Sequence, residues 1–277
     1  MCLIAVAWNP AEELPLVLAS NRDEFHQRPS LPLARWREQP QVIGGRDLRE
    51  GGGWLALHEA GRLAAVTNVR APAAGSAPLS RGRLVRDFVA GADGAAAYAR
   101  ARNTDGAAFG PFNLLAWDGA TLAFASNAPG ASRIAGPGIY GVSNGTLDEE
   151  WPKQRHLSAR LRRWLEQRPD PADPDLEPLL AALADAREAD DGELPDSGVG
   201  LARERWLSAA FIRSPAYGTR ASSVVIVRRD GRTTFFERRF DAEGMACGDS
   251  RIELRLPPPR AAAPTPSATA TATGFHA

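Results

Sequence analysis

The chain has 277 residues, and its 33 basic and 33 acidic side chains give a formal net charge of zero. A hydrophobic content of 44% and a charged content of 24% are typical of a globular protein, which excludes a fibrous repeat or a wholly disordered chain. The balanced charge removes any whole-molecule attraction to nucleic acid or to an anionic membrane. We therefore expect no nucleic-acid partner.

Cysteine usage and the N-terminus indicate the compartment. The two cysteines, Cys2 and Cys247, would form at most one disulfide, which is an unusual way to stabilise a domain of this size and favours a reducing compartment. The apolar run at residues 2–8 has no basic flank and stops at Asn9-Pro10, too soon for a signal peptide or a membrane span. We expect a cytoplasmic protein without stable membrane insertion.

The first half of the chain predicts hairpins and two helices. Apolar runs separated by turn signals pair residues 2–8 with 16–20, 54–58 with 62–66, and 112–117 with 121–125. The last pair turns at Asp118-Gly119, a dipeptide that favours the positive φ angles of tight hairpin turns. Between these hairpins, helical patterns are predicted at 80–91 and 94–102.

The second half predicts more helices and one further hairpin. Apolar residues recur at helical spacing over 151–168, with Pro152 near the first turn. Helices are also predicted at 175–189 and 200–211, and a hairpin pairs 222–229 with 232–237. We interpret the acidic, proline-containing segment 169–199 as a surface insertion or mobile flap.

The last residues differ in composition from the rest. From 257 to 277 the chain is rich in Pro, Ala and Thr and has few large apolar residues to offset the entropy of ordering. We expect one domain over 1–256, followed by a disordered tail.

Four asparagines each follow a Ser or Thr at the end of a predicted strand. They are Asn21, Asn68, Asn127 and Asn144. One hypothesis is that these carboxamides gather at one edge of the sheets, and the alternative is that Ser, Thr and Asn simply end strands in local turns.

Cys2 has the position of an N-terminal nucleophile. Methionine aminopeptidase removes Met1 when the second side chain is small, which would leave an α-amine beside a thiol. The reference pKa values of the two groups, about 8 and about 8.5, suit a base and a nucleophile near neutral pH. The alternative is that Cys2 is only a small apolar residue at the start of a buried strand.

Short motifs downstream of Cys2 stand in one consistent order. They are Asn21-Arg22-Asp23-Glu24, Gly44-Gly45-Arg46-Asp47, Gly51-Gly52-Gly53-Trp54, Thr67-Asn68-Val69-Arg70, Ser80-Arg81-Gly82, Gly141-Val142-Ser143-Asn144-Gly145, Trp151-Pro152-Lys153 and Tyr217-Gly218-Thr219-Arg220. Together they resemble the NRDE family, also called the transport and Golgi organisation 2 family, over about residues 1–256. Gly53 departs from the pattern, since the family usually has threonine there.

The resemblance extends to N-terminal-cysteine hydrolases such as penicillin V acylase and bile salt hydrolase. It implies an α+β fold, a four-layer αββα sandwich of the Ntn-hydrolase type with mostly antiparallel sheets. It also implies that Cys2 is the nucleophile and that the carboxamides of Asn68 and Asn144 act on the reacting group. Arg22 and Asp23 would tune the nucleophile, and Arg220 would be the late arginine of the family. An alternative for Arg22, Asp23 and Glu24 is a charge cluster that ties the first hairpin to the loop at 44–53.

Two functions stay open. One is a thiol amidohydrolase that acts on a non-peptide C–N bond through an acyl-enzyme at Cys2. The other is a non-catalytic carrier for haem or fatty acyl-CoA, cargoes to which the family is linked. The resemblance requires no cofactor, haem being possible only as cargo, and the scattered histidines predict no metal site.

Further residues are candidates for binding a small-molecule amide, acyl-CoA or haem. They are Asn21, Glu24, Trp54, Arg160, Arg162 and Arg163. The three arginines belong to a basic helix face with Lys153, which is either solvated or an anion dock. The sequence leaves the oligomeric state open.

Overall fold

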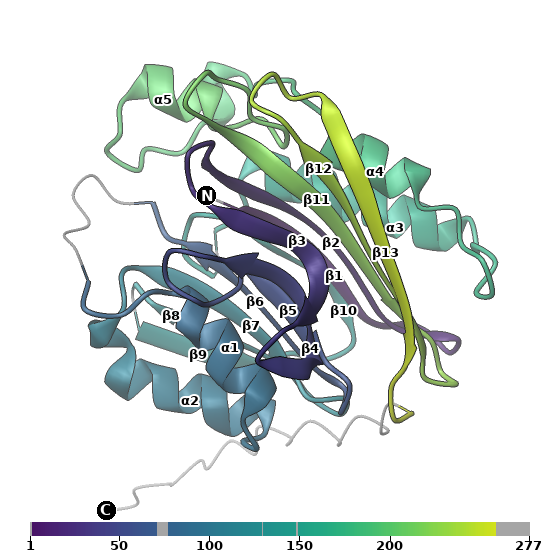
Figure 1. Ribbon diagram of the computed structural model, residues 1–277. Coiled ribbons are helices and arrows are strands. Elements are labelled where there is room, and N and C mark those ends of the chain that lie inside the picture. The colour runs from purple at the N-terminus through teal and green to yellow at the C-terminus, as the bar shows by residue number, and fades with distance from the viewer. Residues whose placement is uncertain (1, 71–76, 129, 148, 259–277) are drawn as a thin grey trace, which may run out of the picture.

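The computed structural model describes residues 2–70, 77–128, 130–147 and 149–258. Two antiparallel sheets face each other, and helices cover their outer faces (Figure 1). This is the α+β, four-layer αββα sandwich expected from the sequence, so that prediction is confirmed.

The six-stranded sheet contains the N-terminus. Its strands, in spatial order, are β10 (Gly138–Val142), β1 (Cys2–Ala11), β2 (Leu14–Phe25), β11 (Tyr217–Val227), β12 (Arg232–Phe240) and β13 (Ala246–Arg255). All neighbouring pairs in it are antiparallel. Strands from the two ends of the chain thus lie side by side, and β2 is next to β11.

The seven-stranded sheet follows chain order. Its strands are β3 (Ser30–Trp36), β4 (Gln39–Asp47), β5 (Leu55–His58), β6 (Arg62–Asn68), β7 (Phe112–Trp117), β8 (Leu122–Asn127) and β9 (Gly130–Ile134). Each strand pairs with the next in sequence, as a meander does.

The helices lie in two layers. The seven-stranded sheet is covered by α1 (Gly82–Ala90) and α2 (Ala95–Asp105), and the six-stranded sheet by α3 (Pro152–Glu166) and α4 (Glu177–Leu183). A fifth helix, α5 (Leu201–Trp206), precedes β11, and single 3₁₀ turns lie at η1 (Gly106–Ala108) and η2 (Asp191–Glu193). Within the described ranges, no helix combines the length and apolar character needed to cross a membrane.

Both faces of strand β1 are packed against other layers of the fold. Ile4, Val6 and Trp8 point into the core between the sheets, whereas Leu3 and Ala5 pack under the helices. Successive strand residues face opposite sides, so both faces of β1 are buried and the run reads as continuously apolar.

Some predicted elements differ from the structure. The helix expected at 175–189 covers only 177–183, and the one expected at 200–211 covers only 201–206. The interpretation of 169–199 as a surface flap is wrong for its middle, because Leu179 and Leu183 of α4 are fully buried against the six-stranded sheet. The tail prediction falls almost wholly on 259–277, and Met1 processing on residue 1, both outside the described residues.

Candidate active site

Cys2 and Arg22 face each other across β1 and β2. They are direct partners in the strand register, so their side chains point to the same face of the sheet, toward the layer between the sheets. Arg22 is 5% exposed, and its guanidinium lies 4.1 Å from the centre of the Trp54 ring. Burial and the nearby Asp23 charge raise the pKa of the Cys2 thiol, and the Asp23 backbone amide and the Arg22 charge oppose that rise. The site thus holds a cation beside the candidate nucleophile.

Asp23 lies on the other face of β2, under the helices. It is 1% exposed and accepts a hydrogen bond of 2.7 Å from the Thr219 hydroxyl. Burial raises the pKa of Asp23, and the Lys153 ammonium, the Thr219 hydroxyl and Arg22 oppose that rise.

Lys153 does not belong to the exposed basic face expected on its helix. It is 4% exposed and donates a 3.0 Å hydrogen bond to the Leu207 carbonyl. Burial lowers its pKa to about 8, against the opposing charges of Asp23, Cys2 and Glu204. Its place beside Trp151-Pro152 in a motif was the one sequence signal that could have separated it from the arginines of the helix.

Asn68 and Asn144 meet where β6 and β10 end. The Asn144 carboxamide nitrogen donates to the Asn68 backbone carbonyl at 2.9 Å and to the Asn68 side-chain oxygen at 3.3 Å. The neighbouring Ser143 hydroxyl donates to the Cys2 carbonyl at 3.4 Å, and β1 contacts β6 across the layer between the sheets. The nucleophile and both carboxamides predicted from the sequence are therefore brought to one place.

The orientation of Asn144 decides what Asn68 can do. The backbone carbonyl of Asn68 can only accept, so the atom of Asn144 that faces it is the amide nitrogen. That nitrogen also faces the Asn68 side-chain oxygen, which turns the Asn68 NH₂ group away from Asn144. Among the described residues, no protein group accepts a hydrogen bond from that NH₂.

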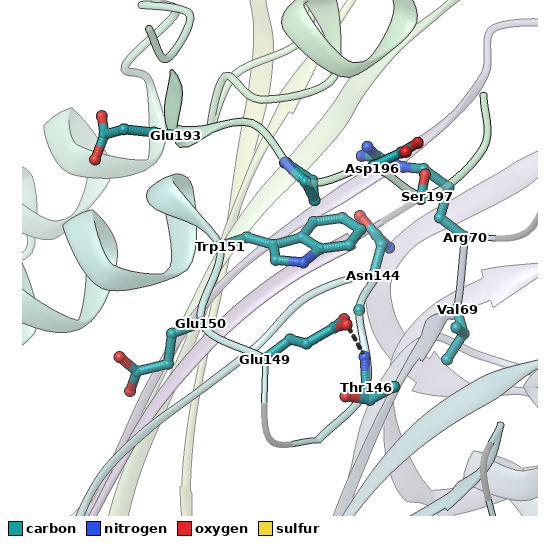
Figure 2. A pocket seen from close by; sticks show the side chains of 12 residues that line it. Val69, Arg70, Asn144, Thr146, Glu149, Glu150, Trp151, Glu193, Asp196 and Ser197 are labelled. Carbon is teal, nitrogen blue, oxygen red and sulfur yellow. Dashed lines mark hydrogen bonds between the residues drawn. The ribbon is translucent and has the colours of Figure 1, made fainter. Parts of the chain in front are cut away.

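A cavity of about 420 Å³ opens beside Asn144 (Figure 2). Trp151 lies in its wall with the Arg70 guanidinium 4.5 Å from the ring centre, and Arg70 is itself paired with the buried carboxylate of Glu204. Four carboxylates also line the cavity, those of Glu149, Glu150, Glu193 and Asp196. The cavity can hold a small molecule, and its rim is acidic.

Two glycine motifs support the Arg22 side of the site. A Cβ on Gly45 would lie 2.0 Å from the Trp54 ring, and a Cβ on Gly52 would lie 2.4 Å from the backbone of Gly82. Both positions therefore need glycine because other groups approach the backbone closely. Trp54, which lies under Arg22, is held in place by its close approach to Gly45.

The other candidates have contacts of their own, although the charges of Glu24 and Arg220 act on Arg22. Asn21 is on the helical face of β2, and its amide nitrogen donates to the carbonyls of Leu183 and Ala210, which gives it a structural contact rather than a place beside Cys2. Arg220 stands at a bulge between β11 and β2 and donates to the carbonyls of Phe25, His26 and Arg28. Glu24 accepts from the Phe25 amide.

The four strand-end asparagines do not all meet, and the candidate arginines of α3 do not lie beside Lys153. Asn127 donates to the carbonyls of Gly106 and Phe109, so only two of the four strand-end asparagines meet. On α3, Arg162 and Arg163 are exposed and Arg160 is partly so, about two to three turns beyond Lys153. In the part of the chain that the structure describes, no three His, Cys, Asp or Glu side chains are grouped to hold a metal ion.

Comparison with known proteins gives the family. The family model described as Transport and Golgi organisation 2 matches residues 1–242. The human Transport and Golgi organization protein 2 homolog is 32% identical over 260 residues, covering 86% of this chain and 92% of that protein, and the Drosophila melanogaster protein is 30% identical over 243 residues, covering 80% and 85%. Among solved structures, the C2A mutant of conjugated bile acid hydrolase from Clostridium perfringens aligns over 92% of each chain at 8% identity with a TM-score of 0.43. On the family match and the relatives, the chain belongs to the Transport and Golgi organisation 2 family.

Proposed function

We propose that this chain is a thiol amidohydrolase that cleaves a non-peptide C–N bond through an acyl-enzyme at Cys2. The observation that carries the proposal is the contact between Asn144 and Asn68 near Cys2, which turns an asparagine NH₂ group away from every described acceptor. Such a donor can stabilise the negative charge that develops on a carbonyl oxygen under attack.

The first half of the reaction forms a thioester. After Met1 is removed, the Cys2 α-amine takes the thiol proton, and the thiolate attacks the carbonyl carbon of an N-acyl amide. The tetrahedral intermediate carries its charge on the former carbonyl oxygen, which accepts a hydrogen bond from the Asn68 NH₂ group. When the C–N bond breaks, the α-ammonium returns a proton to the leaving amine.

The second half frees the enzyme. A water molecule loses its proton to the α-amine and attacks the thioester carbonyl, the C–S bond breaks, and the thiolate recovers the proton as the carboxylic acid leaves. Arg22 favours the thiolate, and Asp23 holds the α-ammonium. No cofactor takes part in these steps.

The two asparagines have different roles in this scheme. Sequence reasoning assigned both to the reacting group, but the amide nitrogen of Asn144 donates to Asn68. We assign oxyanion stabilisation to Asn68 and the orientation of Asn68 to Asn144.

The test uses untagged protein and intact mass. We expect a mature chain that starts at Cys2, and a panel of N-acyl amides from which wild type releases amine. Cys2→Ala should abolish release, whereas Cys247→Ala, which changes the exposed second cysteine, should not. Protein that keeps Met1 yet turns over, or turnover that survives Cys2→Ala, contradicts the mechanism.

The carrier hypothesis gives opposite results in the same samples. It expects retention of haem or acyl-CoA without Cys2-dependent turnover, and weaker, less salt-dependent retention when Arg160, Arg162 and Arg163 are reversed to Glu. Glu149, Glu150 and Asp196 line the cavity beside Asn144, so a cargo held there would have its phosphates or propionates repelled, which favours the hydrolase.

A further inference from the structure

A buried asparagine on β7 holds the backbone on both sides of Asn144. Asn113 is 1% exposed, and its amide nitrogen donates to the Gly145 carbonyl at 2.8 Å and to the Ser143 carbonyl at 3.3 Å. The Thr67 hydroxyl donates to the same Ser143 carbonyl at 2.5 Å. Thr67 and Asn113 are register partners, so both side chains point from the seven-stranded sheet toward this segment.

These bonds join the two sheets at the site. Asn113 belongs to the seven-stranded sheet, whereas Ser143 to Gly145 follow β10 of the six-stranded sheet. Asn113 therefore holds the backbone on either side of Asn144, and the Asn144 side chain in turn donates to Asn68. Asn144 is fully buried, so a shift of its backbone moves the carboxamide that orients Asn68.

We infer that Asn113 is a positioning residue for the oxyanion donor Asn68, an inference that rests on the proposed function. It acts through the backbone of Ser143 and Gly145 and does not itself touch the substrate. With Thr67 it forms a clamp that fixes the place and orientation of Asn144.

The other end of the Asn113 side chain supports this role. Its carbonyl oxygen is buried and has no hydrogen-bond partner among the described residues. The oxygen therefore does not hold this segment, and the side chain acts through its amide nitrogen, which holds the Ser143 and Gly145 carbonyls.

Two reagents that react with Cys2 distinguish the positioning of the oxyanion donor from the strength of the nucleophile. Acylation by p-nitrophenyl acetate passes through a tetrahedral oxyanion, whereas alkylation by iodoacetamide is a displacement at a saturated carbon and forms none. The ratio of the two rates thus reports oxyanion stabilisation without the natural substrate. All variants carry Cys247→Ala, so that Cys2 is the one remaining cysteine of the chain.

The variant is Asn113→Leu and the matched control is Asn127→Leu. The Asn127 amide nitrogen also holds two backbone carbonyls, but those of Gly106 and Phe109. Its oxygen accepts from the Phe112 amide, so the control also removes a hydrogen bond next to Asn113 without touching Ser143 or Gly145. Its side chain lies on the other face of the sheet from that of Ser126, which faces the Asn113 side. We expect Asn113→Leu to lower the acylation-to-alkylation ratio by about tenfold or more, with alkylation unchanged within about twofold. Asn127→Leu should keep the ratio, and Asn68→Ala should lower it about 100-fold or more.

Each outcome separates the inference from the proposed function. A lower ratio in Asn68→Ala with an unchanged ratio in Asn113→Leu overturns the clamp alone. An unchanged ratio in Asn68→Ala overturns the oxyanion role on which the clamp depends. If Asn113→Leu does not fold, Thr67→Val removes the second donor to Ser143 with little change of shape: a threefold or greater fall in the ratio supports the clamp, and an unchanged ratio overturns it.

Discussion

Replacing Arg22 by Met removes the cation opposite Cys2 and keeps an apolar stem against Trp54. Directly paired strand residues have Cβ atoms about 5 Å apart, so we take a charge separation of about 7 Å and an effective dielectric constant of about 20 to 40. Coulomb's law then gives an attraction of about 1.2 to 2.4 kcal/mol between the thiolate and the guanidinium. The pKa of the Cys2 thiol should therefore rise in Arg22→Met.

The rate of alkylation by iodoacetamide reports this shift. At pH 7 the loss of this attraction lowers the thiolate fraction about 8- to 60-fold, but the more basic thiolate is also the better nucleophile, with a Brønsted coefficient of about 0.4 to 0.5. The net result is alkylation about 3- to 11-fold slower in the variant. The difference should narrow as the pH rises through the wild-type pKa, because the thiolate fraction of wild type then stops increasing.

Arg46→Met is the matched control for this change. The Arg46 guanidinium lies 4.1 Å from the centre of the Trp36 ring, as that of Arg22 does from Trp54, but Arg46 is not a register partner of Cys2. Rates are measured from pH 6 to 10.5 by intact mass in a Cys247→Ala background, with circular dichroism to verify folding. A folded Arg22→Met with the wild-type profile, or an equal shift in Arg46→Met, refutes the electrostatic reasoning.

Two predictions concern stability. Gly52→Ala should lower the free energy of unfolding by about 1 to 3 kcal/mol in urea titrations, because its Cβ would overlap Gly82, whereas Gly192→Ala, with nothing within 4 Å, should have little effect; equal losses would contradict the close-approach argument. Burial lowers the pKa of Lys153 to about 8, against about 10.4 in an unfolded chain, so the unfolded state binds more protons between these pH values. The free energy of unfolding of wild type should therefore rise by up to about 3 kcal/mol from pH 8 to 10.4 relative to Lys153→Met, and parallel pH dependences would argue against a buried ammonium.

The hairpins were predictable because local chemistry specifies them. Asp118-Gly119 and Asp230-Gly231 stand between β-forming runs, and Gly119 and Gly231 have the positive φ that such turns need. Strand β3 was missed because its residues are largely exposed or only partly buried, as at an edge of a sheet, which leaves little periodic signal to read. Strand β13 is also an edge strand, but it did carry a signal, because Ile252 and Leu254 alternate with polar residues and pack against the core.

Some site residues could be predicted from the sequence and others could not. Cys2, Arg22, Asn68 and Asn144 stand in motifs and could be named from the sequence, but their relative roles depend on the direction of one hydrogen bond. Lys153 was hidden among the arginines of α3, because burial of one helix position is decided by what packs against it.

Asn113 was hidden for a different reason. It is a polar residue inside the buried run Phe112–Trp117, and that contrast was the available signal. What it binds follows Val142, in the other sheet, and could not be read from β7 alone.

The cost of burial bears on the choice between enzyme and carrier. Around Cys2 the fold buries charged and amide side chains to 8% exposure or less, namely Arg22, Asp23, Arg70, Asn113, Asn144, Lys153 and Glu204. Removing such groups from water opposes folding unless each finds partners, and replacing them by apolar residues of similar volume is often neutral or stabilising. The acyl chain or the apolar ring of a retained cargo gains nothing from them, and the carrier hypothesis places the anionic groups of the cargo on Arg160, Arg162 and Arg163 instead. A site in which charge moves from a thiolate to a carbonyl oxygen does gain, because fixed charges and donors need not reorganise during the reaction. This distribution of buried polar groups supports the hydrolase over the carrier.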